Sequence, residues 1–272
     1  MLNRLIVLID FSEATHSIIA LAAKWSNLLQ AEVLLLHQVP GLAPVLTEQE
    51  VKNQIIENEI KEAQVKLKHL AEDAFADDTI FYTQASAKNL TESLSALVEK
   101  SHRNLILLGL KETGLMKKIF FGSVATKIIE DVNNTCVAVP AHASNLEPES
   151  LSIAVHHKFP LNQTALNQLL EIFSGCIKEI EFISLIKSPD EEAETKQYLK
   201  QLAEEYHKKI QTSYHLFKGA DVGAELKNYM QHKPKSILVL QKGTRKLNDN
   251  LLRRFTVHDL VHDGSMPLII MP

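Results

Sequence analysis

The same succession of apolar runs and helical segments occurs twice along this chain, and this repeat limits the folds open to it. Ile153–His157 follows Ile6–Asp10 at the same separation at which Ile180–Ile186 follows Val33–Val39. The later runs match at a shorter separation, so the second half lacks residues mainly between its second and third runs. Matching order with one localised length change predicts two tandem copies of one unit, which 272 residues accommodate.

The apolar runs of the first half have the character of strands in a parallel sheet. They are apolar throughout rather than alternating, which is typical of strands covered by helices on both faces. Helical segments with apolar residues three or four apart separate them, which predicts right-handed strand–helix–strand units. The predicted strands are Leu5–Ile9, Val33–Leu36, Thr79–Thr83, Leu105–Leu108 and Cys136–Val139.

Capping residues and a polar stretch predict where helices begin and where the halves divide. Ser12 is placed to cap the first helix, and Thr47 with Glu50 forms a capping box before a long second helix. Ser188, followed by a proline, opens a shorter helix in the second half. The polar residues 141–150 are the expected linker, so the predicted domains are residues 1–142 and 151–272.

Composition narrows the classes of protein to which the chain can belong. Hydrophobic residues make up 45% and charged residues 23%, which is typical of globular proteins and excludes extended disorder. No apolar run reaches the roughly 18–20 residues of a membrane-spanning helix, and no signal peptide is recognisable. The net charge of −4 gives no reason to expect nucleic acid or membrane as a partner. We expect Cys136 and Cys176 to be buried free thiols, in a cytoplasmic protein.

Three polar segments are expected to meet at the carboxyl edge of the first sheet, where open parallel sheets bind ligands. Asp10–Ser12 follows the first strand, and its carboxylate can accept hydrogen bonds from a ribose hydroxyl. His37–Val39 ends the second strand, where backbone groups can contact a base edge. Gly109–Val124 runs from the fourth strand through a glycine-bearing loop to a helix N-terminus. Glycines let a backbone approach phosphates, and a helix N-terminus attracts anions.

The third segment resembles the nucleotide-binding loop of the universal stress protein family. That loop has a glycine, two residues, a second glycine, nine residues, and then Gly-Ser or Gly-Thr. Gly109 matches the first glycine and Gly122–Ser123 the last pair, while Ile9–Glu13 and Leu35–His37 also match the family pattern. The resemblance covers the first half from end to end and the second half only in its order of elements.

The resemblance implies strand order 3-2-1-4-5, adenine nucleotide binding and a role in stress survival. By position it assigns the ribose to Asp10, the adenine to Gln38 and the phosphates to the loop and the following helix. The expected cofactor is ATP or another adenine nucleotide with Mg²⁺. The predicted nucleotide-binding residues are Asp10, Phe11, Ser12, Gln38, Gly109, Leu110, Lys111, Gly122, Ser123 and Val124.

Glu112 departs from the family pattern because it stands where the second glycine is expected. A carboxylate facing phosphates opposes their binding by about 1 kcal/mol when solvated, and by more when buried. Gly114 can supply the turn and nearby lysines can offset the charge, or Glu112 can point to solvent. The segment can also be a simple connection in which Ser123 caps the next helix.

The second half lacks the corresponding residues. His157, or His156 if the alignment shifts by one position, replaces the aspartate, and Gln241 replaces the first glycine. Arg254–Phe255 stands in place of the last pair, although Gly243 survives among basic residues. We therefore predict that the second half has kept the scaffold and lost the site.

The sequence gives little indication of zinc binding or of catalysis. His258 and His262 have a spacing that can hold zinc, and His156–His157 could join them, but a solvated helix face is the favoured interpretation. No nucleophile elbow, intact Walker loop or acid–base pair is present in the sequence. No metal site, no catalytic residue and no enzymatic activity are predicted.

The predicted function is a stress-response protein that binds an adenine nucleotide in its first domain as a regulatory ligand. The alternatives are a nucleotide-free interaction scaffold with both sites degenerate, and a weak ATP hydrolase. The fifth strand of each unit leaves an unpaired edge that must be covered. Cys136–Val139 and Leu268–Ile270 are therefore expected to meet, either within the chain as a pseudo-dimer or across a homodimer.

Overall fold

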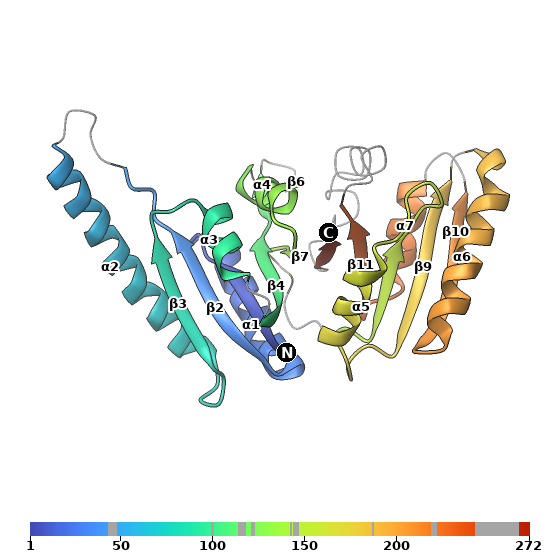
Figure 1. Ribbon diagram of the computed structural model, residues 1–272, viewed down its shortest axis with the longest axis horizontal. Coiled ribbons are helices and arrows are strands. Elements are labelled where there is room, and N and C mark those ends of the chain that lie inside the picture. The colour runs from blue at the N-terminus through green and yellow to red at the C-terminus, as the bar shows by residue number, and fades with distance from the viewer. Residues whose placement is uncertain are drawn as a thin grey trace.

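Ten strands form one sheet in the order β10-β9-β8-β11-β12-β7-β4-β1-β2-β3 (Figure 1). The computed structural model describes residues 1–42, 48–98, 101–113, 118–120, 123–141, 143, 147–186, 188–218, 222–242 and 267–272, without the side chains of 111–113, 118–120 and 222–223. The strands of the first half are β1 (Leu2–Leu8), β2 (Ala31–Gln38), β3 (Phe81–Ser86), β4 (His102–Gly109) and β7 (Thr135–Val139). Those of the second half are β8 (Ser150–Ala154), β9 (Glu179–Ile186), β10 (Gln211–Lys218), β11 (Ser236–Gln241) and β12 (Leu268–Met271).

Each half contributes five parallel strands in the order 3-2-1-4-5. In the first half β1 lies between β2 and β4, with β3 and β7 outside them. In the second half β8 lies between β9 and β11, with β10 and β12 outside them. The predicted fold class, two tandem Rossmann-like units, is therefore confirmed.

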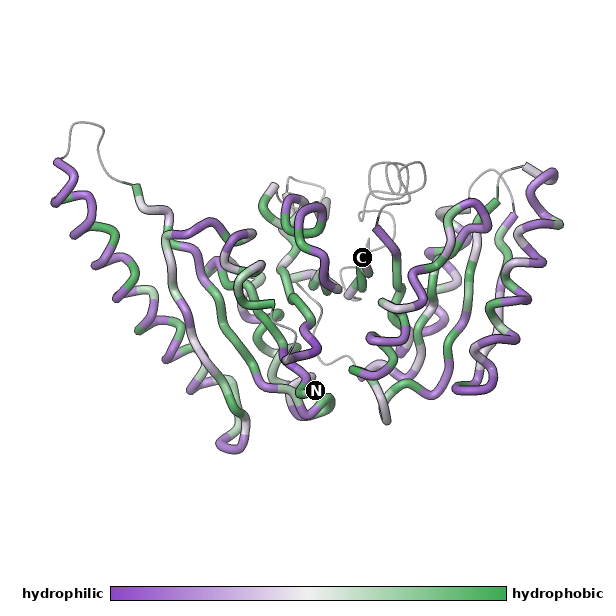
Figure 2. The backbone as a smooth tube through the Cα atoms, viewed as in Figure 1, coloured by the Kyte–Doolittle hydropathy of each residue, from purple (hydrophilic) through white to green (hydrophobic). Residues whose placement is uncertain are grey.

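Helices cover both faces of the sheet. The helices are α1 (Ala14–Leu29), α2 (Gln49–Ala74), α3 (Leu90–Leu97), α4 (Ser123–Asp131), α5 (Gln163–Ile172), α6 (Glu192–His207) and α7 (Val222–Gln231), with a 3-10 turn at Pro189–Glu191. On one face Leu5 of β1 shares a core with α1, α2, α5 and α6, and on the other Ile6 shares a core with α3, α4 and α7. The strands are accordingly apolar along their length, whereas α2 and α6 carry long hydrophilic stretches (Figure 2).

The first helix starts later than its predicted cap. Helix α1 begins at Ala14 with Glu13 at the N-cap, and no side chain accepts a capping hydrogen bond there. Ser12 lies instead in a turn in which its N–H donates to Asp10 Oδ1 at 3.0 Å. Phe11 has a left-handed backbone with φ 55°, which the sequence did not predict and which delays the helix.

The predicted beginnings of the second helix and the third strand are not confirmed. Thr47 of the expected capping box is outside the described residues, and the N-cap of α2 is Glu48 without a side-chain bond. The third strand begins at Phe81 rather than at Thr79, because Thr79 N–H donates to Ala76 O at 2.9 Å and closes a turn. A residue whose N–H is committed to a turn is not available to the sheet.

The second half contains the predicted cap at Ser188. Its Oγ accepts a hydrogen bond from Asp190 N–H at 3.3 Å, ahead of the 3-10 turn and α6.

The predicted linker lies between the last strand of the first half and the first strand of the second. Strand β7 ends at Val139 and β8 begins at Ser150. The domain limits 1–142 and 151–272 stay a prediction.

The register of the second half corrects the repeat alignment by one residue. Ile153 belongs to the same core face as Val7, and each pairs with the corresponding residue of the neighbouring fourth strand. Ile153 therefore corresponds to Val7 rather than to Ile6, which makes His156 the counterpart of Asp10. A shift of one residue would turn every side chain of the strand to the opposite face.

The two halves meet at a seam, the antiparallel pairing of β7 with β12. Ala138, Val137 and Cys136 lie opposite Leu268, Ile269 and Ile270, so the two expected edge strands pair within one chain. Beside the seam, the ring of Trp25 from α1 packs edge-on against Phe173, with centroids 5.2 Å apart. Both cores continue across the seam, so the halves share one interior.

Both cysteines are free. Cys136 is buried in β7, and burial raises the pKa of its thiol to about 12. Cys176 is partly buried, and burial also raises its thiol pKa. Among the described helices, none combines the length and the apolar character needed to cross a membrane.

Candidate functional site

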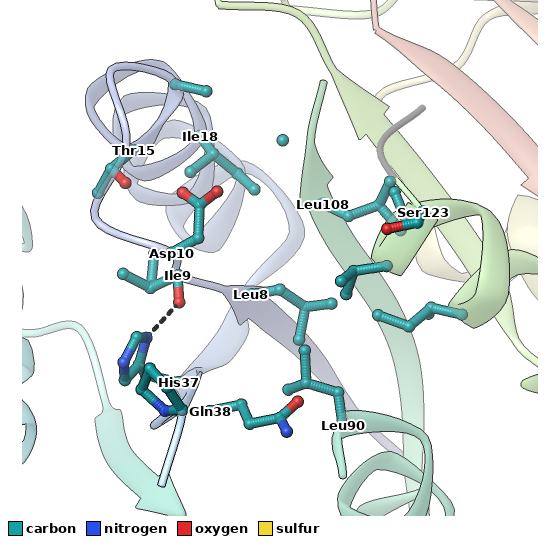
Figure 3. A pocket seen from close by; sticks show the side chains of 16 residues that line it. Leu8, Ile9, Asp10, Thr15, Ile18, His37, Gln38, Leu90, Leu108 and Ser123 are labelled. Atoms are coloured by element: carbon teal, nitrogen blue, oxygen red, sulfur yellow. Dashed lines mark hydrogen bonds between the residues drawn. The ribbon is translucent and has the colours of Figure 1, made fainter. Parts of the chain in front are cut away.

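A cavity of about 440 Å³ opens at the carboxyl ends of β1, β2 and β4 (Figure 3). This volume lies within the range of small-molecule sites. The lining is mostly aliphatic, with Leu8, Ile18, Leu108 and Ile128 among the wall residues. The position is the one predicted for a ligand on an open parallel sheet.

Half of the predicted nucleotide-binding residues line this cavity. They come from four separate segments and are Asp10, Gln38, Gly109, Ser123 and Val124. Figure 3 places Asp10 on one side of the cavity, Ser123 on the opposite side, and Gln38 beside Leu90.

The other predicted residues lie elsewhere or are not described. Phe11 and Ser12 belong to the turn that precedes α1 and are not among the lining residues. Leu110 is completely buried in the core. Only the backbone of Lys111 is described, and Gly122 lies outside the described residues.

The turn after β1 sets the position of the Asp10 carboxylate. Ile9 N–H donates to Leu36 O at 2.9 Å, which holds the end of β1 against β2. Asp10 Oδ1 then accepts the Ser12 N–H, so the side chain closes its own turn, as aspartate commonly does. One carboxylate oxygen thus has a structural contact, while the residue lines the cavity.

His37 links the ends of β1 and β2 at the rim of the cavity. Its Nδ1 lies 2.7 Å from Ile9 O, and because a carbonyl only accepts, Nδ1 carries the proton. The Phe11 ring packs against the imidazole with centroids 4.7 Å apart. The sequence placed His37 in a polar segment but assigned it no role.

Packing at the end of β4 favours a glycine at position 109. A Cβ at this position would lie 3.2 Å from Ala14 Cβ, closer than such contacts normally are. The glycine lets the first turn of α1 approach β4, which brings that turn to the cavity wall. The sequence predicts that this glycine lets the backbone approach phosphates, and the structure adds helix packing as an independent reason for a glycine.

The loop after Gly109 folds back on itself. Leu110 N–H donates to Val139 O at 2.8 Å. The two short strands β5 (Lys111–Thr113) and β6 (Lys118–Phe120) then pair antiparallel, with Glu112 opposite Ile119. The expected glycine-bearing loop is therefore a β-hairpin over these residues, and α4 follows it.

Thr15 lines the cavity and was not predicted from the sequence. It lies in the first turn of α1 and is 6% exposed. Its Oγ1 is buried and has no hydrogen-bond partner among the described residues. Its sequence signal was weak, because a threonine next to a helix start usually indicates no more than local capping.

Comparison with known proteins identifies the family. The sequence profile described as the universal stress protein family matches residues 1–140. This chain belongs to the universal stress protein family. No curated protein sequence matches it at a significant level.

Solved structures agree with this universal stress protein in fold. A universal stress protein from Archaeoglobus fulgidus is 14% identical, with a TM-score of 0.68 over 99% of this chain and 98% of that one. A protein from Pseudomonas aeruginosa described as a universal stress protein is 13% identical, with a TM-score of 0.59 over 99% and 93% of the two chains. The cytoplasmic domain of a prokaryotic cation chloride cotransporter is 11% identical, with a TM-score of 0.50 over 99% and 95%. At these identities the likeness concerns the fold alone.

In the second half of this universal stress protein, the equivalent strand end is filled by two histidines. The rings of His156 and His157 stack with centroids 4.5 Å apart. His157 Nδ1 lies 2.8 Å from Thr195 Oγ1, and its Nε2 lies 3.2 Å from Glu194 Oε2. Burial, followed by the neighbouring His157, lowers the pKa of His156 below its usual value.

Gln241, the counterpart of Gly109, also contacts its own chain. Its Oε1 accepts Asn162 N–H at 2.7 Å, and its Nε2 donates to Pro160 O at 3.2 Å. Within the described part of the chain, no group of three or more histidine, cysteine, aspartate or glutamate side chains is placed to hold a metal. The remaining second-half positions considered from sequence, Gly243, Arg254–Phe255, His258 and His262, lie outside the described residues.

Proposed function

We propose that this universal stress protein binds an adenine nucleotide in the cavity of its first half, as a regulatory ligand. Membership of the family supports a stress-response function. The observation that carries the proposal is the meeting of Asp10, Gln38, Gly109 and Ser123 around one cavity. We place this role in the cytoplasm, in keeping with the family resemblance.

The lining offers a chemically matched surface for each part of such a ligand. A carboxylate at Asp10 accepts hydrogen bonds from ribose hydroxyls, and the Gln38 amide both donates to and accepts from a base edge. Leu8, Leu108 and Ile128 provide an apolar wall for a planar base. The N-terminus of α4, beginning at Ser123, presents backbone N–H groups that favour an anion.

Binding rather than turnover is the proposed activity. Of the titratable side chains that line the cavity, Asp10 accepts the Ser12 N–H, and His37 Nδ1 is committed to Ile9 O. Mg²⁺ would neutralise phosphate charge if the ligand carries two or more phosphates. A ligand held between the ends of β1, β2 and α4 would stabilise the carboxyl edge of the first sheet. The regulatory effect would follow from a change in what this edge contacts.

The proposal is tested by isothermal titration of the full chain with AMP, ADP and ATP, with and without Mg²⁺. We expect saturable binding of at least one nucleotide, and at least tenfold weaker binding by Asp10→Ala, or about 1.4 kcal/mol. Asp77→Ala is the matched control, because Asp77 is exposed and does not line the cavity, and it should bind like the natural chain. No heat change with any of the three at millimolar concentration would exclude nucleotide binding and favour the interaction scaffold.

A further inference from the structure

Lys242 directly follows β11 in the second half, and its side chain bonds to a helix of the first half. Its Nζ donates to Val132 O at 2.5 Å and to Ile129 O at 3.4 Å, at the C-terminal end of α4. The last carbonyls of a helix have no partner within it, and a cation there also matches the negative end of the helix dipole. A side chain of one half therefore caps a helix of the other.

The equivalent backbone position in the first half carries a leucine. Lys242 N–H donates to Met271 O at 2.8 Å, as Leu110 N–H donates to Val139 O at 2.8 Å. Each donor directly follows the fourth strand of its half, and each acceptor is the last residue of the fifth. Leu110 is completely buried, so this position of the fold accommodates an apolar side chain. The topology itself therefore does not require an amine here.

The amine of Lys242 depends on the carbonyls that it contacts. Lys242 is partly buried, and burial lowers the pKa of its ammonium below the usual value, while the nearby Cys136 and Asp131 oppose this shift. An ammonium that is partly removed from water needs hydrogen-bond acceptors in the protein. The end of α4 supplies them.

Helix α4 forms one wall of the cavity in the first half. Figure 3 shows Ser123, the first residue of α4, on the side of the cavity opposite Asp10. Val124, Ala125 and Ile128 of the same helix also line the cavity. With nine residues, α4 is shorter than the roughly 12–15 residues that a helix needs to be stable on its own. Its order therefore depends on tertiary contacts, and the bonds from Lys242 are among them.

We infer that the second half, through Lys242, holds α4 in place and so maintains a wall of the first-half cavity. Lys242 is a positioning residue, because it acts through α4 and does not line the cavity itself. The second half, whose own strand ends bond within that half, thereby keeps a role in the first. The hold on α4 follows from the contacts, whereas its effect on a ligand rests on the proposed function.

The hold on α4 is tested by hydrogen–deuterium exchange of the full chain without ligand, in the natural protein and in Lys242→Met. Methionine keeps an unbranched stem and removes the amine. We expect the amides of Ser123–Asp131 to exchange about fivefold faster, because a cap is lost, while those of β1 and β2 keep their rates. Lys242→Arg keeps the charge and the donors and should restore the protection. Unchanged exchange in α4, or equally faster exchange throughout the first half, would overturn the inference.

Lys233→Met is the matched control within the second half. Lys233 is also partly buried, but its Nζ donates to Glu181 Oε2 at 2.7 Å inside that half. Its loss should leave exchange in α4 unchanged. If both variants sped up exchange in α4 alike, the effect would be general to the fold, and the assignment to Lys242 would be wrong.

A second exchange experiment measures the consequence for a ligand. Whichever of AMP, ADP and ATP binds most tightly should slow exchange in α4 at saturation, because a ligand that contacts a wall of its site stabilises that wall. If the nucleotide binds and exchange in α4 does not change, the inferred link to the cavity fails while nucleotide binding stands. If no nucleotide binds, the proposed function fails, and ligand-free exchange decides whether Lys242 holds α4.

Discussion

The two halves build the same turn after their first strand and give it different chemistry. In the first half Asp10 Oδ1 accepts the N–H of Ser12, and in the second His156 Nδ1 accepts the N–H of Lys158 at 3.2 Å. Both acceptors thus bond the N–H two residues ahead. The turn is part of the fold, and the identity of the acceptor decides whether a carboxylate or an imidazole stands at the strand end.

The ends of the fourth strands differ in the same way. Gly109 leaves room for α1 and for a cavity, whereas Gln241 fills its position and bonds to Asn162 and Pro160. The same topology therefore does not by itself produce a ligand cavity at the carboxyl edge of the sheet. A few side chains at the strand ends decide whether that edge stays open or bonds to its own chain.

The largest expected effect comes from breaking the packing that joins the halves. Trp25 is completely buried and packs on Phe173 of the second half, so Trp25→Ala should lower the free energy of unfolding by about 3–5 kcal/mol. Urea unfolding followed by circular dichroism measures this as one transition. Tyr82→Ala, at a 53% exposed residue, should change stability by less than about 0.5 kcal/mol. Two separate transitions would show that the halves fold independently.

Replacing Asp10 by histidine, the residue at the equivalent position of the second half, should affect ligand affinity without affecting the stability of the fold. Asp10→His keeps an acceptor for the Ser12 N–H, so the melting temperature should change by a few degrees at most. AMP affinity should fall at least tenfold, about 1.4 kcal/mol, because the carboxylate is lost. Titration calorimetry and thermal unfolding measure the two quantities. Unchanged affinity would mean that Asp10 serves only the turn.

Glu112→Gly restores the second glycine of the family's nucleotide-binding loop. We expect ATP affinity to rise about fivefold relative to AMP, since removal of a solvated carboxylate near phosphates is worth about 1 kcal/mol. Glu112→Gln removes the charge without adding the backbone freedom of a glycine. Comparing the two variants therefore separates the effect of the charge from the effect of the backbone. An unchanged ratio of ATP to AMP affinity in both variants would mean that Glu112 does not limit phosphate binding.

The smallest expected effect is a pH dependence of stability that arises at His156 in the second half. Burial lowers the pKa of His156, so the unfolded chain takes up a proton at a higher pH than the folded chain. Stability should therefore fall as pH drops through the ordinary pKa of histidine, about 6.5. His156→Asn keeps an acceptor for the Lys158 N–H and should flatten the profile between pH 7.5 and 5.5, measured by urea unfolding. Equal slopes in both proteins would contradict this assignment.

Much of the candidate site followed from residues that end predicted strands. Asp10, Gln38 and Gly109 were expected to meet at one edge of the sheet and line the same cavity, because the carboxyl ends of parallel strands share one edge; their role in nucleotide binding stays a prediction. Thr15 was missed, since its exposure and its lack of a partner depend on which segments cover α1. The β5–β6 hairpin was missed as well, because the glycines of that segment indicated an open loop.

The sequence by itself determined the repeat and the succession of parallel strand–helix–strand units, while strand order 3-2-1-4-5 was implied by the family resemblance. It could do so because strands buried on both faces must be apolar along their length, and because helices between parallel strands must cross over in one sense. Only the tertiary structure decided that His156, and not His157, corresponds to Asp10. The local pattern is nearly the same in either register, and the choice rests on which core each side chain of β8 enters.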